Sequence, residues 1–193
     1  MSELSLRSDA SGDSAGGVLV IGYGNPLRSD DGVGWHAAAS LAAALLAGDS
    51  RLAGVEILAR HQLTPELALD ISGASLVIFV DAVANEPPGS IAVRQLAGAG
   101  SAPGAGSAPG AGSAPGAGSA PGATSHHLGP AVLLAMARDL YGATPDAFVV
   151  GVGVADMEVG EALTRAVAAA LPAVADRVAG LVAAHRRSGA APG

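Results

Sequence analysis

The fold of this chain follows from residues 18–34, Val18-Leu-Val-Ile-Gly-Tyr-Gly24-Asn-Pro-Leu-Arg-Ser-Asp30-Asp31-Gly-Val-Gly34. Four apolar residues, typical of a buried strand, run into a glycine turn, and two acidic residues follow just before an amphipathic helix. This order is that of the first strand, loop and helix of an open α/β sheet, in which ligands bind at the carboxyl ends of the strands. A carboxylate in that crevice must be paired, solvated or bound to a cation, so the two acidic residues need a chemical explanation.

Strand-like and helix-like segments alternate along the rest of the chain. Further strands are expected at 55–58, 76–80, 90–94 and 148–152, and helices from 33, from 64, after 130 and over about 164–187. Such alternation predicts βαβ units and a mostly parallel sheet. We therefore expect an α/β fold, a three-layer αβα sandwich with a five-stranded, mostly parallel twisted sheet. The strand at 90–94 is expected at an edge of that sheet.

The chain is expected to form one domain, residues 17–187, because its 193 residues suffice for a single core. Between Gly100 and Ala123 the unit Gly-Ser-Ala-Pro-Gly-Ala occurs four times without change. Such a segment has too little apolar surface to offset the entropy of ordering it. We expect a disordered repeat insert at 98–123, and disordered tails at 1–16 and 188–193.

The composition excludes several classes of protein. The sequence contains no cysteine, which excludes a disulfide scaffold, a thiolate metal site and a cysteine nucleophile, and fits a reducing compartment. With 10 Lys and Arg residues and a net charge of −7, the chain has no basic patch for nucleic acid. Residues 1–16 lack the apolar core of a signal peptide, and charges interrupt the Ala-rich segments. We expect a cytoplasmic protein with no nucleic-acid or membrane partner.

Two carboxylates and a histidine are predicted to meet at one crevice. Asp81 directly follows the strand at 76–80, which neighbours the first strand in a sheet of order 2-1-3, so Asp31 and Asp81 would face the same switch point. His126 and His127 follow the insert and precede the next helix. Imidazole with two carboxylates is a mixed nitrogen and oxygen ligand set that suits divalent metals such as nickel or zinc.

Each of these residues also has an ordinary structural interpretation when it is taken alone. Asp30 or Asp31 serves as a helix N-cap, Asp81 as a turn residue, and His126 or His127 as a surface residue at a helix start. Two adjacent acids indicate a division of labour, in which one caps and the other faces the crevice. The sequence leaves open which acid does which.

The glycine turn also allows a nucleotide-binding interpretation. Gly22-Tyr-Gly24 would open a dinucleotide fingerprint, but the third glycine of that fingerprint falls on Leu27. A phosphate would also lie beside the carboxylates of Asp30 and Asp31. A nucleotide-binding oxidoreductase is therefore the less favoured alternative.

These motifs resemble those of the hydrogenase maturation proteases, which trim the C-terminal tail of a nickel-iron hydrogenase large subunit. The family's opening, G-x-G-N-x-L-x-x-D-(D/E)-x-x-G, corresponds to residues 22–34. Its Asp-Ala after an apolar strand corresponds to Asp81-Ala82, and its His-x-x-Gly to His126-His127-Leu128-Gly129. Apart from the insert, the resemblance covers about residues 17–185.

The resemblance implies an endopeptidase of aspartic type that removes the C-terminal extension of a nickel-loaded large-subunit precursor. Asp31, Asp81 and His126 would bind nickel that the precursor itself supplies, with no nucleotide cofactor. The catalytic roles of Asp31 and Asp81 are not separable from metal binding. A weaker expectation assigns substrate binding to four residues, Gly24, Asn25, His61 and Gln62. A non-catalytic nickel carrier or adaptor with the same ligands is the alternative from another class.

Two departures from the family pattern concern substrate recognition. Many members carry Asp-Gly-Gly after the second strand, where this chain has Arg60-His61-Gln62, and the family's proline soon after the last strand is Ala155. The partner hydrogenase therefore stays open. The mechanism of cleavage also stays open: either a metal polarises the scissile carbonyl, or a carboxylate activates water.

Overall fold

The computed structural model describes residues 4–6, 16–96 and 128–189, so the insert at 98–123, His126 and His127 lie outside the described residues. The described chain forms one six-stranded sheet of order β1-β3-β2-β4-β6-β5. The strands are β1 (Leu4–Leu6), β2 (Gly17–Tyr23), β3 (Val55–Arg60), β4 (Ala74–Val83), β5 (Ile91–Leu96) and β6 (Asp146–Gly153). The helices are α1 (Val33–Leu46), α2 (Leu67–Ser72), α3 (Pro130–Tyr141) and α4 (Arg165–Gly189), with single 3-10 turns η1 (Ser29–Gly32) and η2 (Ser50–Leu52).

The sheet is mostly parallel, as predicted. Strand β2 pairs in parallel with β3 on one side and β4 on the other, and β4 pairs in parallel with β6. The two edge strands, β1 and β5, run antiparallel to their neighbours. The predicted strand order around β2 and the edge position of the 90–94 segment are therefore confirmed.

Several boundaries differ from the prediction. Strand β4 continues to Val83, so Asp81 lies within the strand and pairs with Gly151 rather than following the strand directly. The sheet has six strands rather than five, because Leu4–Leu6, within the tail expected at 1–16, pairs with Ile57–Ala59 of β3. Three residues are too few to show strand alternation, and an edge pairing depends on a partner that is distant in the sequence. Helix α4 also continues to Gly189, past the boundary expected at 187.

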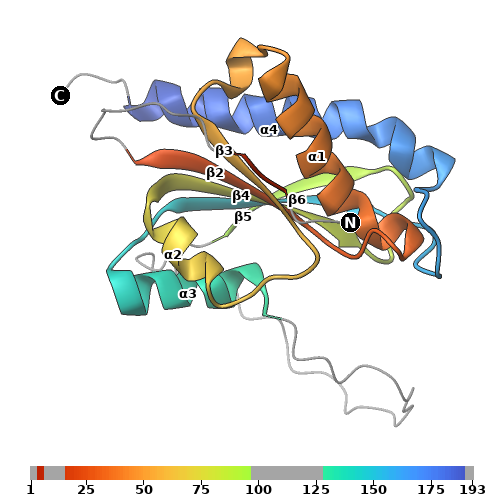
Figure 1. Cartoon of the computed structure of the whole chain (residues 1–193), viewed down its shortest axis with the longest axis horizontal. Helices are drawn as coiled ribbons and strands as arrows, with labels where there is room; N and C mark the ends of the chain where they lie inside the picture. The colour runs from red at the N-terminus through yellow and green to blue at the C-terminus, as the bar shows by residue number, and fades with distance from the viewer. Residues whose placement is uncertain (1–3, 7–15, 97–127, 190–193) are drawn as a thin grey trace, which may run out of the picture.

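Helices cover both faces of the sheet, which makes the predicted three layers (Figure 1). Alternate residues of the central strands point to opposite faces: Val18 and Val20 pack with α1 and α4, while Leu19 and Ile21 pack with α2 and α3. Because both faces are buried, these strands are apolar throughout rather than alternating with polar residues. At the start of α1, a Cβ on Gly34 would lie 2.3 Å from the carbonyl oxygens of Tyr23 and Val80. Glycine is therefore what lets the helix begin directly against β2 and β4.

Helix α4 covers the α1 side of the sheet with a single apolar stripe. Among the described residues it is the one helix that is long and apolar enough to cross a membrane, with a mean hydropathy of 1.6 over its most apolar window. Its buried residues recur every three or four positions and join the core: Val167, Ala170, Val174, Val178 and Val182. We therefore interpret α4 as a core-covering helix.

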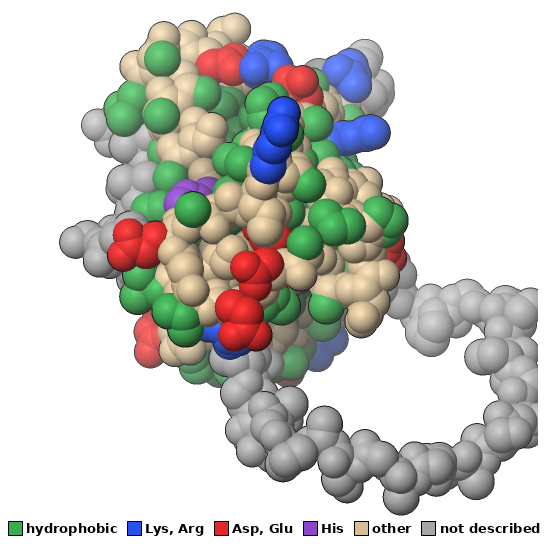
Figure 2. Space-filling view, turned by 90° about the vertical axis from the view of Figure 1, so that its right-hand side faces the viewer, with side chains coloured by type: hydrophobic (Ala, Val, Ile, Leu, Met, Phe, Trp, Pro, Cys, Tyr) green, Lys and Arg blue, Asp and Glu red, His purple; other side chains and the backbone are tan. Residues whose placement is uncertain are grey.

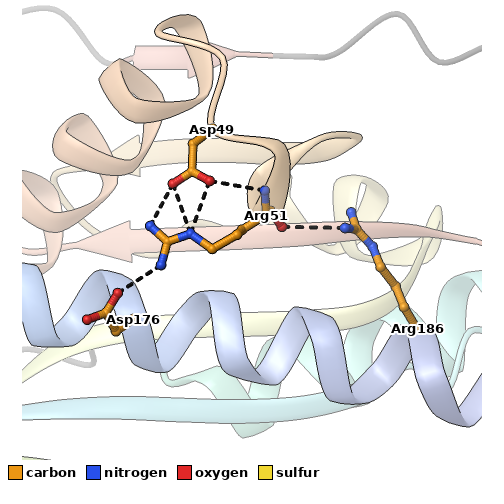
Figure 3. Close-up of polar contacts among 4 residues, drawn as sticks. All are labelled: Asp49, Arg51, Asp176 and Arg186. Carbon is orange, nitrogen blue, oxygen red and sulfur yellow. Dashed lines mark hydrogen bonds and ion pairs between the residues drawn. The ribbon is translucent and has the colours of Figure 1, made fainter.

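A group of polar contacts joins the outer side of α4 to η2 (Figure 3). Arg51 contacts Asp49 at 2.7 Å and Asp176 of α4 at 2.9 Å, and Arg186 donates to the carbonyl oxygens of Arg51 and Ala53. Because these side chains are in contact with solvent, each ion pair contributes little to stability. The contacts fix where the carboxyl-terminal half of α4 lies against the connection between α1 and β3.

The loop from β2 to α1 is tied to the loop from β6 to α4 by Asp30. The carboxylate of this fully buried residue accepts hydrogen bonds from the backbone of Ala155 at 3.0 Å, of Asp156 at 3.2 Å and of Thr164 at 2.7 Å, and from the Thr164 hydroxyl at 2.9 Å. Ser29 and Gly160 add a backbone bond of 2.7 Å between the same loops. Burial by itself would raise the pKa of Asp30, but the hydrogen bonds outweigh it and hold the pKa below its ordinary value.

Replacing Asp30 with alanine is expected to lower the free energy of unfolding by about 3 kcal/mol or more, because several buried donors lose their acceptor. The loss should be full at pH 7 and shrink below pH 3.8, the ordinary pKa, since the wild-type carboxylate is then protonated on unfolding and gives up its advantage. Urea unfolding of both proteins across this range measures it.

Asp139→Ala is the matched control, because Asp139 is an exposed carboxylate paired with its neighbour Arg138. The Asp139→Ala substitution should leave the free energy of unfolding nearly unchanged. A similar effect of both substitutions would contradict the anchoring role of Asp30.

Candidate functional site

A cleft of about 560 Å³ opens at the carboxyl-terminal end of the central strands, β3, β2 and β4. Figure 2 views this end of the molecule and shows acidic side chains near the middle of the face. The residues that line the cleft are Tyr23, Gly24, Asn25, Arg28, Asp31, His61, Gln62, Leu63, Asp81, Leu128, Gly129 and Pro130. The cleft therefore lies at the switch point predicted from the strand order.

The two adjacent acids of the opening motif have separate tasks. Asp30 is turned into the protein, whereas Asp31 lines the cleft. The backbone amide of Asn25 donates to Asp31 Oδ2 at 3.2 Å, so the glycine turn orients this carboxylate. Gly24 is required next to it, because it has a φ of 137° and a Cβ there would lie 1.9 Å from the carbonyl oxygen of Asp31.

Asp81 lines the same cleft and is held at both of its oxygens. The Tyr23 hydroxyl donates to Oδ2 at 2.5 Å, and the Ala82 amide donates to Oδ1 at 2.8 Å. The pKa of Asp81 is raised to about 6, mainly by burial and to a smaller extent by the negative charge of Asp31, while the hydrogen bonds from Tyr23 and Ala82 oppose the shift. Burial and the neighbouring Asp81 charge likewise raise the pKa of Tyr23.

This pair of carboxylates has the donor chemistry that a divalent cation requires. Two like charges face one cleft, and a cation between them would relieve both the repulsion and the cost of burial. Within the described part of the chain, no group of three His, Asp or Glu residues is arranged to hold a metal ion. Asp31 and Asp81 thus meet as predicted, while the third ligand, His126, stays a prediction because it lies outside the described residues.

The four residues expected to bind substrate all line the cleft. Asn25 also has a structural task, since its Oδ1 accepts a hydrogen bond of 3.0 Å from the Leu27 amide and so shapes the turn. His61 and Gln62 follow β3, in the segment where this chain departs from the Asp-Gly-Gly pattern. Their position at the cleft agrees with the prediction, and their role in substrate binding stays untested.

Tyr23 and Arg28 also line the cleft, although no motif in the sequence singles them out. Strand register contains the signal for Tyr23: Gly22 pairs with Val80, so the next residues along the two parallel strands, Tyr23 and Asp81, lie beside each other. Arg28 adds a cation to the wall, and its Nε donates to the Met157 carbonyl at 3.1 Å. That contact depends on the β6–α4 loop, and nothing near Arg28 in the sequence indicates it.

A second polar cluster lies at the other end of the sheet, between the starts of β4 and β6. His185 contacts Ser75 Oγ at 2.9 Å through Nε2 and Asp146 Oδ2 at 3.3 Å through Nδ1. Serine, histidine and aspartate are connected here in the same order as in the catalytic triad of a serine hydrolase. However, the Ser75 hydroxyl donates its proton to the Gly16 carbonyl at 2.5 Å and therefore cannot donate it to the imidazole. The cluster therefore fastens α4 to the sheet rather than activating a nucleophile.

No family model matches the sequence, and a search among curated proteins also finds no match. Among solved structures, the chain is similar to the hydrogenase maturating endopeptidase HybD from E. coli, with a TM-score of 0.62 and 24% identity over 89% of this chain and 93% of that one. It is also similar to HycI from Thermococcus kodakarensis KOD1, titled a nickel-iron hydrogenase maturation protease, with a TM-score of 0.56 and 18% identity over 89% and 94% of the two chains.

A third similar structure is the hydrogenase 2 maturation peptidase from a Thaumarchaeota archaeon, with a TM-score of 0.54 and 24% identity over 86% of this chain and 97% of that one. The coverage is nearly complete on both sides in all three comparisons. At these identities the likeness establishes the fold. The α/β architecture predicted from the sequence is therefore shared with these solved structures. They bear the names of the protein family that the opening motif resembles.

Asp81→Asn is expected to stabilise the protein at neutral pH. The folded protein holds the Asp81 proton more tightly than the unfolded chain, with a pKa of about 6 against 3.8, so stability is lost as the pH rises through this window. Removing the charge should raise the free energy of unfolding by about 1–3 kcal/mol at pH 8 and by little at pH 4. Urea unfolding at both pH values gives the difference; an equal effect at the two would refute a buried, repelled Asp81 carboxylate.

Proposed function

We propose that the chain is an endopeptidase that removes the C-terminal extension of a nickel-iron hydrogenase large-subunit precursor. One observation carries the proposal: Asp31 and Asp81, the two carboxylates singled out by the motif, line one cleft at the switch point of the sheet. The similar solved structures, which bear the names of maturation endopeptidases, support the same assignment. The proposal makes the chain a hydrolase of the cytoplasm, without a nucleotide cofactor.

In this proposal nickel belongs to the substrate. Asp31 and Asp81, together with His126, complete the coordination of a metal that the precursor already carries, and so place its tail in the cleft. Three protein ligands form an incomplete set for nickel, and this favours weak binding of the free metal. Recognition of metal and peptide as one unit would restrict cleavage to precursors that have received their nickel.

The residues of the cleft have defined tasks in peptide hydrolysis. The Asn25 amide orients Asp31, and Tyr23 with the Ala82 amide orients Asp81. In the free protein the Asp81 carboxyl has a pKa of about 6, so it is ionised at neutral pH and can bind the metal of the precursor. The metal, when it is bound, supplies the Lewis acidity that polarises a carbonyl.

Two alternative functions would use the same cleft. A nickel carrier would employ the same ligands without cleaving a peptide, and cleavage of the precursor tail distinguishes it from the proposed enzyme. A nucleotide-dependent oxidoreductase would require phosphate to bind beside Asp31 and Asp81, where like charges repel it. The second alternative is therefore the weaker one.

Asp31→Asn, Asp81→Asn and His126→Ala are each expected to lower precursor cleavage by more than about 100-fold, because each removes a ligand that the metal needs. Tail release from a nickel-loaded precursor, followed by gel mobility and mass, measures the loss. Circular dichroism verifies that each variant is folded. His127→Ala is the matched control for His126 and should retain most of the activity; normal cleavage by any of the three ligand variants would remove that residue from the site.

The isolated protein is expected to bind free Ni²⁺ weakly and to cleave only a precursor that already contains nickel. Calorimetry with the metal alone tests the first half. Parallel cleavage assays with loaded and metal-free precursor test the second half. Tight binding of free Ni²⁺, or equal cleavage of both precursors, would favour a resident catalytic metal or a metal-independent carboxylate mechanism.

A further inference from the structure

Asp81 is held by a partner that no motif in the sequence requires. Its Oδ2 accepts the 2.5 Å hydrogen bond from Tyr23, and its Oδ1 accepts the amide of the residue that follows it. An ionised carboxylate has about four acceptor positions on its two oxygens. With two positions occupied, one lone pair on each oxygen stays available toward the cleft.

We propose that Tyr23 is a positioning residue that locks the Asp81 carboxylate in one orientation and directs its remaining lone pairs toward the nickel of the bound precursor. This inference rests on the proposed function and deepens it. Without the hydroxyl, Asp81 keeps only its contact with the Ala82 amide, and rotation about its side-chain bonds becomes freer. The bond from Tyr23 would persist when Asp81 binds a cation, because it uses a different lone pair.

Tyr23 itself is well suited to hold another side chain still. It is the last residue of β2, and its ring packs against the buried cluster between the sheet and helices α2 and α3. A tyrosine has only two side-chain torsions, and here the ring is fixed by packing while the hydroxyl reaches the cleft. Because the sheet and the packed ring hold Tyr23 in place, its hydroxyl restricts the movement of the Asp81 carboxylate.

Asp31 has fewer hydrogen bonds to its carboxylate than Asp81 among the described residues. The contact described for its carboxylate is the single bond of 3.2 Å from the Asn25 amide. Among the described residues, the Asp81 carboxylate therefore accepts one hydrogen bond more than the Asp31 carboxylate. This difference makes Asp81 the better fixed ligand for an incoming cation.

Tyr23→Phe removes the hydroxyl and leaves the ring, and Tyr141→Phe is the matched control. Tyr141 is the other tyrosine of the chain, half exposed at the end of α3. The measurements are kcat and KM for nickel-loaded precursor, with the full-length protein, and circular dichroism verifies that each variant is folded. We expect Tyr23→Phe to lower kcat/KM by about 10-fold, the usual effect of losing a partner that orients a ligand, and Tyr141→Phe to leave it unchanged.

A second measurement needs no substrate. A hydroxyl proton shared in a short hydrogen bond with a carboxylate gives a far-downfield proton NMR signal. The signal should be present in the wild type and in Tyr141→Phe, and absent in Tyr23→Phe and weakened or shifted in Asp81→Asn. Its absence in the wild type would overturn the inference independently of any activity.

The outcomes separate the inference from the function on which it rests. If the wild type cleaves loaded precursor and Tyr23→Phe keeps the same kcat/KM, Tyr23 has no positioning role and the proposed function stands. If Tyr23→Phe loses activity together with its fold, the hydroxyl matters only for the fold, and the inference is again overturned. If the wild type does not cleave loaded precursor, both fail.

Discussion

The buried carboxylate of Asp30 is the constraint on which the site depends. It collects donors from three residues of the connection between β6 and α4, and it is contributed by the connection between β2 and α1. These two loops flank the end of the sheet at which the cleft opens. Since Asp31 is the next residue, its place in the cleft follows from how firmly Asp30 is bound.

Asp81 illustrates the opposite use of a carboxylate. Asp30 has its charge satisfied by hydrogen bonds, and its pKa lies below the ordinary value. Asp81 is buried beside a like charge, and its pKa rises to about 6. A protein that only needed stability would not retain the second arrangement, because it weakens the folded state at neutral pH. Strain of this kind is typical of functional sites, where a ligand or substrate later supplies the missing charge.

The rest of the architecture supports the position of these few side chains. The central strands are buried on both faces, and helices α1 and α4 on one side and α2 and α3 on the other hold their register (Figure 1). Because β2 and β4 are parallel and Gly22 pairs with Val80, the next residues along the two strands, Tyr23 and Asp81, lie beside each other. Gly34 keeps the start of α1 close enough to both strands for Asp31 to reach the same cleft.

The sequence by itself determined the α/β class, the order of the three central strands and the meeting of Asp31 with Asp81. These features follow from local patterns: apolar runs that mark buried strands, glycines that mark a tight turn, and the topological rule that parallel strands end at one edge. Only the tertiary structure decided that Asp30 is the structural acid, that Tyr23 holds Asp81 and that Leu4–Leu6 adds an edge strand. Each of these depends on partners that are distant in the chain: Thr164 for Asp30, Asp81 for Tyr23 and β3 for the edge strand. A local pattern reports which face a residue prefers, whereas the choice of hydrogen-bond partner is made when distant loops pack together.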